Sequence, residues 1–265
     1  MDCANGATSV INKTIFENLG AKVTLIHADS AYGTKINHDC GSTHLESLQT
    51  LVTKDHLDFG MAFDGDGDRC LLVDAKGEVI DGDQVIAILA PFFNLNSIAI
   101  TVMANQGLLN WAKENHITTE ITPVGDSNVF AAMKEKHIEI GGEQSGHTIL
   151  PGEPTGDGIL TALTVAKVVA TSGKSLASLA SVMTRSPQII LNLSATNDQK
   201  SALKTSDAAK KLLLDYSKKL DQLSGRLLVR PSGTEPLIRI TMWGNDEQKI
   251  TDLANKLKKE LEQTL

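Results

Sequence analysis

Residues 57–73 read LDFGMAFDGDGDRCLLV, in which an acidic segment stands between two apolar runs. The apolar runs predict two buried strands, and the segment between them predicts a short loop. Three carboxylates stand at alternate positions of this loop, at Asp64, Asp66 and Asp68, with only glycine between them. Side chains at alternate positions of an extended segment point to the same side, so their oxygens can converge on one hard divalent cation. The sequence therefore predicts a metal site in the loop, with a solvated acidic turn as the alternative.

An EF-hand calcium loop also opens with acidic residues at its first, third and fifth positions. Counted from Asp64, the sixth position is Arg69, where an EF-hand needs glycine, and the twelfth is Ala75, where it needs glutamate. Calcium sensing of that type is excluded. Mg²⁺ is the expected cofactor, because this ion keeps an octahedron of oxygen ligands and often shares it with a substrate phosphate.

The composition excludes several classes of partner. The chain has 265 residues, 41% of them hydrophobic, and a formal net charge of −7, so it is long enough for two or three domains with real cores. No basic stripe is present to neutralise a nucleic acid backbone, so nucleic acid is not expected as a partner. The longest apolar run, residues 85–93, is about half of the roughly 20 residues that a membrane-spanning helix needs.

The expected location is cytoplasmic. The first residues have neither the basic nor the apolar region of a secretory signal. The cysteines, Cys3, Cys40 and Cys70, are odd in number, widely spaced and without a CxxC pair. This pattern indicates neither a disulfide framework nor a zinc site and is typical of a reducing compartment.

Helical and strand periodicities alternate along the first part of the chain, which predicts an α/β fold with a parallel sheet. Helices are expected at residues 8–19 and 44–54, and strands at 22–26 and 57–63, with a hairpin at 76–78. The acidic loop follows the second of these strands. Ligand sites in parallel sheets lie beyond the carboxyl ends of the strands, so this position favours a functional site.

Three domains are predicted: a metal-binding α/β domain at residues 1–82, a sugar-binding α/β domain at 83–187, and a small phosphate-binding α+β domain at 188–265. The second domain is expected to contain strands at 97–103 and 119–124, a strand that begins at Glu139, and helices at 84–92, 108–115, 129–136 and 159–170. The third is expected to contain strands at 189–193, 226–229 and 237–242, and helices at 205–223 and 246–261.

Two further loops carry chemistry. Gly142-Glu143-Gln144-Ser145-Gly146-His147 offers a carboxylate, an amide, a hydroxyl and an imidazole, which suit a polyhydroxylated ligand, with a polar surface turn as the alternative. Thr155-Gly156-Asp157-Gly158 precedes an apolar helix, for which Asp157 is the predicted N-cap.

The third loop of interest is Arg230-Pro231-Ser232-Gly233-Thr234-Glu235-Pro236, with Arg239 on the strand that follows. A guanidinium can hold phosphate through two parallel hydrogen bonds, and two hydroxyls can donate more. The glycine lets backbone N–H groups approach the same anion. The segment therefore predicts a phosphate site, although such a composition also suits a simple turn.

The ordered set of a metal loop, a sugar-type loop and a phosphate-type loop resembles the α-D-phosphohexomutase superfamily. The resemblance covers essentially the whole chain, from Asp2-Cys3-Ala4-Asn5-Gly6-Ala7 through Val124-Gly125-Asp126 to the loop at 230–236. Gln144 favours the branch that interconverts glucosamine 6-phosphate and glucosamine 1-phosphate through a bisphosphorylated intermediate. The branches that act on mannose and glucose phosphates are the alternative.

The resemblance also implies residue roles. Asp64, Asp66 and Asp68 would ligate Mg²⁺, and Arg69 would hold the reacting phosphoryl group. Glu143 and Ser145 would bind sugar hydroxyls, with His147 as a catalytic residue close to the reacting end. The non-reacting phosphate of a phosphorylated hexosamine would be held by Arg230, Ser232, Gly233, Thr234 and Arg239.

The chain departs from the superfamily in two ways. Members begin with another domain, which carries the phosphoserine that gives and receives the phosphoryl group and contributes a metal ligand. This chain starts at what would be the second domain, with its opening strand cut short at Met1, and none of its serines stands in the expected Ser-His-Asn-Pro context. In addition, Ser127 follows Gly125-Asp126 where the glucosamine branch usually has arginine.

These departures define the expected activity. We expect little or no mutase turnover from the chain alone, and a complementing N-terminal serine domain as its partner. A non-catalytic phosphosugar-binding protein, which would keep the binding loops without a nucleophile, is the alternative from another class. A Mg²⁺ phosphatase is disfavoured because no nucleophile or base stands beside the acidic loop in the sequence.

Overall fold

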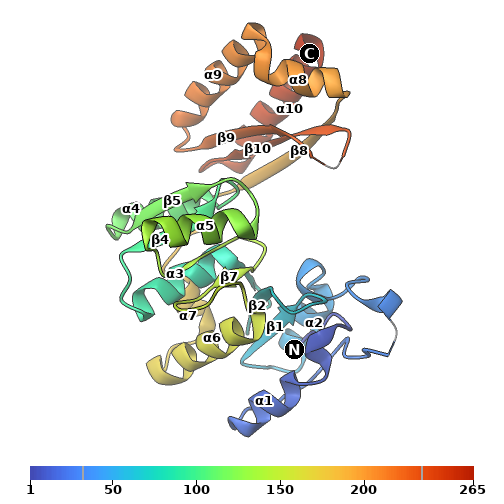
Figure 1. The fold of residues 1–265 in the computed structure, drawn as a ribbon, viewed down its shortest axis with the longest axis vertical. Coiled ribbons are helices and arrows are strands. Elements are labelled where there is room, and N and C mark those ends of the chain that lie inside the picture. Colours follow the sequence, from blue (N-terminus) through green and yellow to red (C-terminus); the bar gives the residue numbers. More distant parts are fainter. Residues whose placement is uncertain (32, 234) are drawn as a thin grey trace. The chain divides into compact units, whose positions relative to one another are not determined.

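The computed structural model describes residues 1–31, 33–233 and 235–265 (Figure 1). These residues form two units, which we call the amino-terminal unit (residues 1–104 with 108–184) and the carboxyl-terminal unit (105–107 with 185–265). The predicted mixture of α/β and α+β architecture is confirmed. No helix of the described part of the chain is long and apolar enough to cross a membrane.

The first sheet is a meander of β1 (Phe59–Phe63), β2 (Cys70–Asp74) and β3 (Val79–Ile80). Adjacent strands are antiparallel, with Phe63 opposite Cys70, so the acidic loop is the turn of a hairpin. The predicted parallel sheet is wrong here. A segment as short as residues 64–69 can only reverse the chain, because a parallel pair needs a crossover of about a dozen residues. The predicted hairpin at 76–78 is confirmed by the pairing of β2 with β3.

The strand predicted at residues 22–26 is also wrong. Ile26 makes only an isolated parallel bridge with Asp2, which bridges Ala62 of β1 on its other side. The N–H of Asp2 donates to Met61 O at 2.8 Å, and the N–H of Phe63 donates to Asp2 O at 3.0 Å. The amino group of Met1 also donates to Thr24 O at 2.6 Å, but residues 22–25 form no regular ladder.

The helices of this region are short. The predicted helix at 8–19 is divided into the 3₁₀ turn η1 (Ala7–Ser9) and α1 (Asn12–Asn18), and Ile11, the residue before α1, makes no side-chain cap. Two more 3₁₀ turns, η2 (Gly33–Lys35) and η3 (Gly41–Thr43), follow. The predicted helix at 44–54 is confirmed as α2 (Glu46–Lys54), which packs Leu48 and Val52 against Ala62 and Val73 of the sheet.

The second sheet has the order β5-β4-β6-β7 and contains the predicted parallel pairs. Strand β4 (Ser97–Thr101) runs parallel to both β5 (Thr118–Thr122) and β6 (Gly141–Gly142), and β7 (Thr148–Ile149) returns antiparallel to β6. The crossovers contain α4 (Gln106–Glu114) and α5 (Asp126–Lys136), close to their predicted positions.

One buried helix joins the two sheets of the amino-terminal unit. All residues of α3 (Gly82–Phe92) up to Ala90 are buried, and the helix packs on β4 and β6, on α6 (Gly158–Ser172) and on α7 (Leu176–Ala180). A single apolar cluster contains Leu72 of the first sheet, Ile86 of α3 and Ile100 of the second sheet. The two predicted α/β domains therefore share one continuous core.

The carboxyl-terminal unit is the predicted small α+β fold. Its antiparallel sheet has the order β8-β10-β9, formed by β8 (Gln188–Ser194), β9 (Arg226–Pro231) and β10 (Leu237–Trp243). The helices α9 (Asp207–Asp221) and α10 (Glu247–Thr264) pack on this sheet (Figure 1). The sequence did not predict α8 (Asn197–Thr205), which begins with a capping box formed by Thr196 and Gln199.

Candidate functional site

The acidic loop joins β1 to β2 and gathers its three carboxylates. One oxygen each of Asp64, Asp66 and Asp68 lies within 4.8 Å of the other two. Asp64 is buried, and its Oδ1 accepts hydrogen bonds from the N–H groups of Gly67 and Arg69, both at 3.2 Å. Asp66 is exposed and Asp68 is half-buried. The backbone thus fixes one carboxylate at the base of the loop while another faces solvent.

The charges of this loop are only partly compensated. Burial, and next the neighbouring Asp68, raise the pKa of the Asp64 carboxyl. Arg69 Nε lies 3.7 Å from Asp64 Oδ2 and 3.8 Å from Asp68 Oδ1, but Asp68 Oδ1 is buried and accepts no hydrogen bond from the described residues. A divalent cation bound among the three carboxylates would offset their repulsion and engage this oxygen. The donor set consists of carboxylate oxygens, so it fits Mg²⁺.

His147 connects the acidic loop to a distant segment of the chain. Its ring is buried, with Nδ1 at 3.0 Å from Asp68 Oδ2 and Nε2 accepting a hydrogen bond from the N–H of Gly156 at 3.1 Å. A ring nitrogen that accepts an N–H carries no proton, so this hydrogen-bond pattern makes Nδ1 the donor of the ring. His147 therefore donates to Asp68 and orients its carboxylate.

Glycines from two other segments enclose the backbone of the acidic loop. A Cβ atom on Gly6 would lie 2.1 Å from Gly65 O, and one on Gly158 would lie 2.5 Å from Arg69 O. The N–H of Gly158 also donates to Gly67 O at 2.9 Å. Sequence reasoning missed this role, because the sequence around Gly158 predicts only the helix cap at Asp157. That cap is confirmed: Asp157 Oδ1 accepts a hydrogen bond from the N–H of Leu160 at 2.9 Å.

The sugar-type loop lies beside the acidic loop, joined to it by a bridge between Arg69 and His147. Glu143 is half-buried and its Oε1 accepts a hydrogen bond from the N–H of Gly125 at 3.0 Å. Ser145 is exposed, and its hydroxyl donates to Glu143 Oε2 at 3.4 Å. The structure thus brings together Arg69, Glu143, Ser145, His147 and the three carboxylates within one unit.

Gln144 has a supporting position in the same loop. Its Nε2 donates to Asp81 Oδ2 at 3.1 Å, and Asp81 Oδ1 accepts from the N–H of Gln84 as the N-cap of α3. Asp81 is a residue that sequence reasoning missed. An aspartate directly before Gly-Asp at the start of an apolar helix is an N-cap signal that could have identified it.

A cavity of about 360 Å³ opens in front of the acidic loop. Its polar lining includes Asp66 and Asp68 from the loop, Thr8 from η1, and Glu153 and Asp157 from the segment that His147 contacts. The volume is at the lower end of the range for small-molecule pockets. Asp66 and Asp68 therefore face a space that a small polar ligand can enter.

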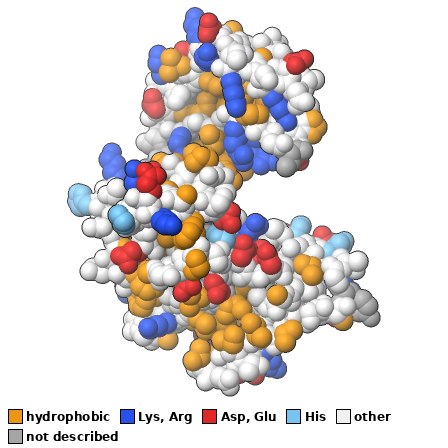
Figure 2. Space-filling view, viewed as in Figure 1, with side chains coloured by type: hydrophobic (Ala, Val, Ile, Leu, Met, Phe, Trp, Pro, Cys, Tyr) orange, Lys and Arg blue, Asp and Glu red, His pale blue; other side chains and the backbone are white. Residues whose placement is uncertain are grey.

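In the carboxyl-terminal unit, two arginines face each other across the sheet. Arg230 of β9 stands directly opposite Arg239 of β10. Burial, and next the Arg239 charge, lower the pKa of Arg230, and Arg230 Nε is buried without a hydrogen-bond partner among the described residues. Like charges directly opposite destabilise a strand pair. Arg239 Nη2 pairs with Glu235 Oε2 at 3.3 Å, and an anion beside Arg230 would stabilise the pair further. Lys and Arg side chains gather on the visible face of this unit (Figure 2).

The loop after Arg230 is held by hydrogen bonds between side chains and the backbone. Ser232 Oγ accepts a hydrogen bond from the N–H of Glu235 at 3.1 Å, and a Cβ atom on Gly233 would meet no atom within 4 Å. Lys200 of α8 donates to the carbonyl of Ser232 at 2.9 Å and to that of Glu235. Sequence reasoning missed Lys200, for which no local pattern gave a signal. Thr234, a predicted phosphate ligand, lies outside the described residues.

The sequence matches one family along nearly its whole length. Residues 1–77, 81–186 and 191–260 match, in that order, the alpha/beta/alpha domain II, the alpha/beta/alpha domain III and the C-terminal domain of phosphoglucomutase/phosphomannomutase. The chain belongs to this family of phosphohexomutases.

Within the family, the chain is similar to phosphoglucosamine mutases. It is 43% identical over 272 residues to that of Caldicellulosiruptor saccharolyticus, with 100% of this chain and 60% of the relative covered. It is 41% identical over 269 residues to that of Clostridium tetani, with 99% and 60% covered. The chain thus spans 60% of the length of these relatives.

Solved structures show the same fold. A phosphoglucomutase/phosphomannomutase family protein from Burkholderia thailandensis superimposes with a TM-score of 0.79 at 22% identity, over 98% of this chain and 60% of that one. Aspergillus fumigatus N-acetylphosphoglucosamine mutase, solved in complex with GlcNAc-6P and magnesium, gives a TM-score of 0.77 at 18% identity, over 97% and 64%.

Proposed function

We propose that this chain provides the metal-binding, sugar-binding and phosphate-binding loops of a phosphoglucosamine mutase, which interconverts glucosamine 6-phosphate and glucosamine 1-phosphate. The convergence of three carboxylates beside a loop that presents Glu143 and Ser145 carries this proposal. Identity of 43% to a phosphoglucosamine mutase supports the glucosamine branch over the mannose and glucose branches. The proposed location is the cytoplasm, supported by three cysteines that are free and buried. We place the activity in amino-sugar metabolism that feeds cell-wall precursors.

In this proposal Asp64, Asp66 and Asp68 hold Mg²⁺, which when bound supplies charge stabilisation to the transferring phosphoryl group. Arg69, whose side chain is 41% exposed beside the loop, binds phosphoryl oxygens. His147 acts by keeping Asp68 in position through its Nδ1–H. Glu143 and Ser145 accept and donate hydrogen bonds to sugar hydroxyls.

The non-reacting phosphate is proposed to bind in the carboxyl-terminal unit, at Arg230, Ser232, Gly233, Thr234 and Arg239. Two observations support this assignment. Arg230 and Arg239 stand directly opposite each other, and Arg230 Nε has no hydrogen-bond partner among the described residues. A guanidinium with a free N–H edge is suited to a phosphate oxygen.

Replacing Arg230 with glutamine is expected to weaken binding of glucosamine 6-phosphate about tenfold or more, because one charge-assisted hydrogen bond contributes about 1.5–3 kcal/mol. Isothermal titration calorimetry on the chain joined to a serine domain of this family measures this change. Lys218→Gln removes an exposed positive charge on α9 and is the matched control. Equal weakening by both variants would show that the chain attracts the ligand only by general charge.

The proposed partner is a domain that carries the phosphoserine of the phosphohexomutase reaction. A chimera that joins the amino-terminal domain of the Caldicellulosiruptor saccharolyticus relative before Met1 is expected to convert glucosamine 6-phosphate to glucosamine 1-phosphate when primed with a hexose bisphosphate. The chain alone is expected to show no conversion, since it provides binding loops without the phosphoryl donor. Conversion is followed by ³¹P nuclear magnetic resonance.

Two results contradict this expectation. The first is conversion by the chain alone that survives Ser145→Ala. The second is a folded chimera that binds glucosamine 6-phosphate but does not convert it. Asp66→Asn in the chimera is the matched inactive control, because it removes the exposed carboxylate of the acidic loop.

A non-catalytic phosphosugar-binding protein is the second candidate. The binding loops of the amino-terminal unit are held together by the contacts of His147 and Gln144 within the chain itself. A sensor of this type would bind glucosamine 6-phosphate at micromolar concentration without any partner. Calorimetry on the chain alone separates it from a mutase portion, which binds tightly only once the serine domain is joined.

A further inference from the structure

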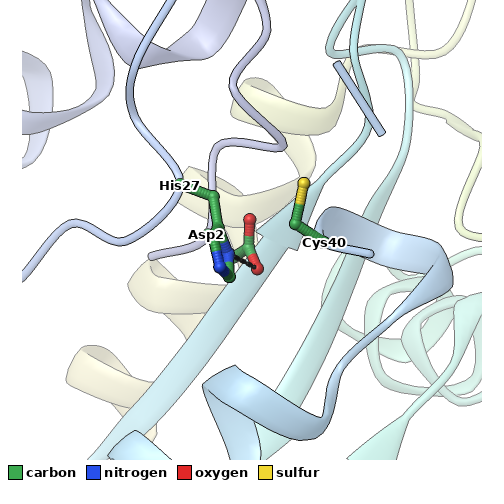
Figure 3. A group of neighbouring side chains, drawn as sticks. All are labelled: Asp2, His27 and Cys40. Carbon is green, nitrogen blue, oxygen red and sulfur yellow. Dashed lines mark hydrogen bonds and ion pairs between the residues drawn. The ribbon is translucent and has the colours of Figure 1, made fainter. Parts of the chain in front are cut away.

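A second group of metal-ligating side chains meets in the amino-terminal unit and contains no residue of the acidic loop. Figure 3 shows Asp2, His27 and Cys40 drawn together from three separate segments of the chain. One ligand atom of each lies within 4.8 Å of the other two. Asp2 belongs to the segment that bridges β1, His27 follows the extended residues 22–26, and Cys40 directly precedes η3.

Two of the three side chains are out of contact with water. Asp2 is 0% exposed and Cys40 1%, while the side chain of His27 is 31% exposed. A buried carboxylate is costly unless it is paired or binds a metal. The partners of Asp2 are the N–H of Ala4, which Oδ1 accepts at 2.9 Å, and His27 Nδ1, which lies 2.7 Å from Oδ2.

The Sγ atom of Cys40 lies beside one hydrogen-bond donor and one acceptor. The side-chain amide of Asn5 donates to its Sγ at 3.7 Å, and the thiol donates to Lys35 O at 3.9 Å. Burial, and next the Asp2 charge, raise the pKa of this thiol. A bound metal ion is the kind of group that displaces a thiol proton in such surroundings, because thiolate is the ligating form.

The backbone around the cluster is held in an uncommon conformation. Ala4, Asn5, His27, Asn37 and Asp39 have φ values of 50°, 52°, 46°, 58° and 51°. These are half of the ten non-glycine residues with positive φ in the described part of the chain. Such conformations persist where the surrounding structure over-determines them, and an ion that links the three segments would add that constraint.

We propose that Asp2, His27 and Cys40 form a second metal site, which binds Zn²⁺ or a divalent ion of similar softness. One thiolate sulfur, one imidazole nitrogen and one carboxylate oxygen are ligands that such an ion prefers and that Mg²⁺ does not. Three protein ligands leave one position of a tetrahedron for water, which reaches the cluster on the exposed side of His27. The site does not depend on the proposed mutase function.

The position of the cluster connects it to the base of the acidic loop. Asp2 O accepts the N–H of Phe63, the last residue of β1 before the acidic loop. An ion bound to the Asp2 carboxylate would therefore fix the segment on which the base of that loop rests. We expect Zn²⁺ to raise the unfolding temperature of the amino-terminal unit when Mg²⁺ is already present in excess.

Co²⁺ titration tests the site, because cobalt bound to a thiolate gives a sulfur-to-metal charge-transfer absorption that oxygen ligands cannot give. The full chain, freed of metals by a chelator and kept reduced with a phosphine, is titrated in excess Mg²⁺ so that the acidic loop is occupied. We expect one Co²⁺ per chain, the charge-transfer band, and displacement of the band by Zn²⁺.

The variants assign the band to the cluster. Cys40→Ser is expected to abolish it, whereas Cys70→Ser, which alters another fully buried cysteine, is expected to keep it. His27→Gln retains a hydrogen-bonding group beside Asp2 and is expected to fold, as circular dichroism can check, yet to weaken Co²⁺ binding about tenfold or more. The proposal is overturned if the wild-type chain gives no charge-transfer band, or if the band survives Cys40→Ser or is unaltered in His27→Gln.

Discussion

Asp64→Asn is expected to weaken Mg²⁺ binding about 30-fold without destabilising the metal-free chain. A carboxylate and a divalent ion about 4 Å apart attract each other by about 2 kcal/mol even at the dielectric constant of water, which corresponds to this factor. The buried position of Asp64 makes the estimate a lower bound. In the metal-free chain, burial and the neighbouring Asp68 raise the pKa of the Asp64 carboxyl. Asp64→Asn removes the negative charge of this group, so the repulsion between residues 64 and 68 falls.

Thermal unfolding with and without Mg²⁺ measures both effects. The wild-type unfolding temperature should rise with Mg²⁺ concentration, as it does for any ligand that binds only the folded state. Asp64→Asn should lose this rise. Asp55→Asn, at an exposed carboxylate after α2, should retain it. If Asp64→Asn responds to Mg²⁺ like the wild type, the acidic loop is not the metal site.

Gly158→Ala is expected to destabilise the amino-terminal unit by about 3 kcal/mol, at the upper end of the cost of overpacking a core. The added Cβ would lie 2.5 Å from Arg69 O and 2.8 Å from Gly67 O, so the backbone of the acidic loop would have to move. Gly158 is the first residue of α6, and alanine forms helices better than glycine by about 1 kcal/mol. Helix propensity alone therefore predicts the opposite sign.

Chemical denaturation of the two proteins, with Mg²⁺ titration of each, checks this expectation. Gly33→Ala is the matched control, because a Cβ at Gly33 would meet no atom within 4 Å and its φ is not positive. It should change the free energy of unfolding by less than about 1 kcal/mol. A Gly158→Ala protein as stable as the wild type, with unchanged Mg²⁺ affinity, would mean that the loop backbone yields without cost.

Local patterns predicted most of the helices and strands, because residues close together in the sequence form the periodicity of each element. The two strands beside the acidic loop and the buried helix α3 are examples. The errors concern partners that lie far away in the sequence. Residues 22–26 have strand-like composition, but their pairing with Met1 to Cys3 gives a single bridge, between Ile26 and Asp2, in place of a regular ladder. The strand direction predicted for the first sheet is wrong, because the length of the connecting loop, rather than the alternation of strands and helices, decides whether neighbouring strands run parallel or antiparallel.

For the candidate site, too, the sequence predicts short-range features and misses contacts between residues that are far apart in the chain. The alternation of Asp64, Asp66 and Asp68 is a short-range signal, and the structure does bring their oxygens together. The contact of His147 with Asp68 joins residues 79 positions apart, so no local pattern shows it. The close packing of Gly158 on the loop is of the same kind, since it depends on two backbones meeting.

The burial of α3 has a consequence for ligand selection. This helix shares one core with Phe63 and Cys70, which flank the acidic loop, and its cap Asp81 binds Gln144 of the sugar-type loop, so the amino-terminal unit should unfold in a single cooperative transition. The acidic loop and the sugar-type loop are also joined directly by the bridge between Arg69 and His147. Their separation is then nearly constant, and a ligand that reaches from one to the other is accepted or rejected by its length.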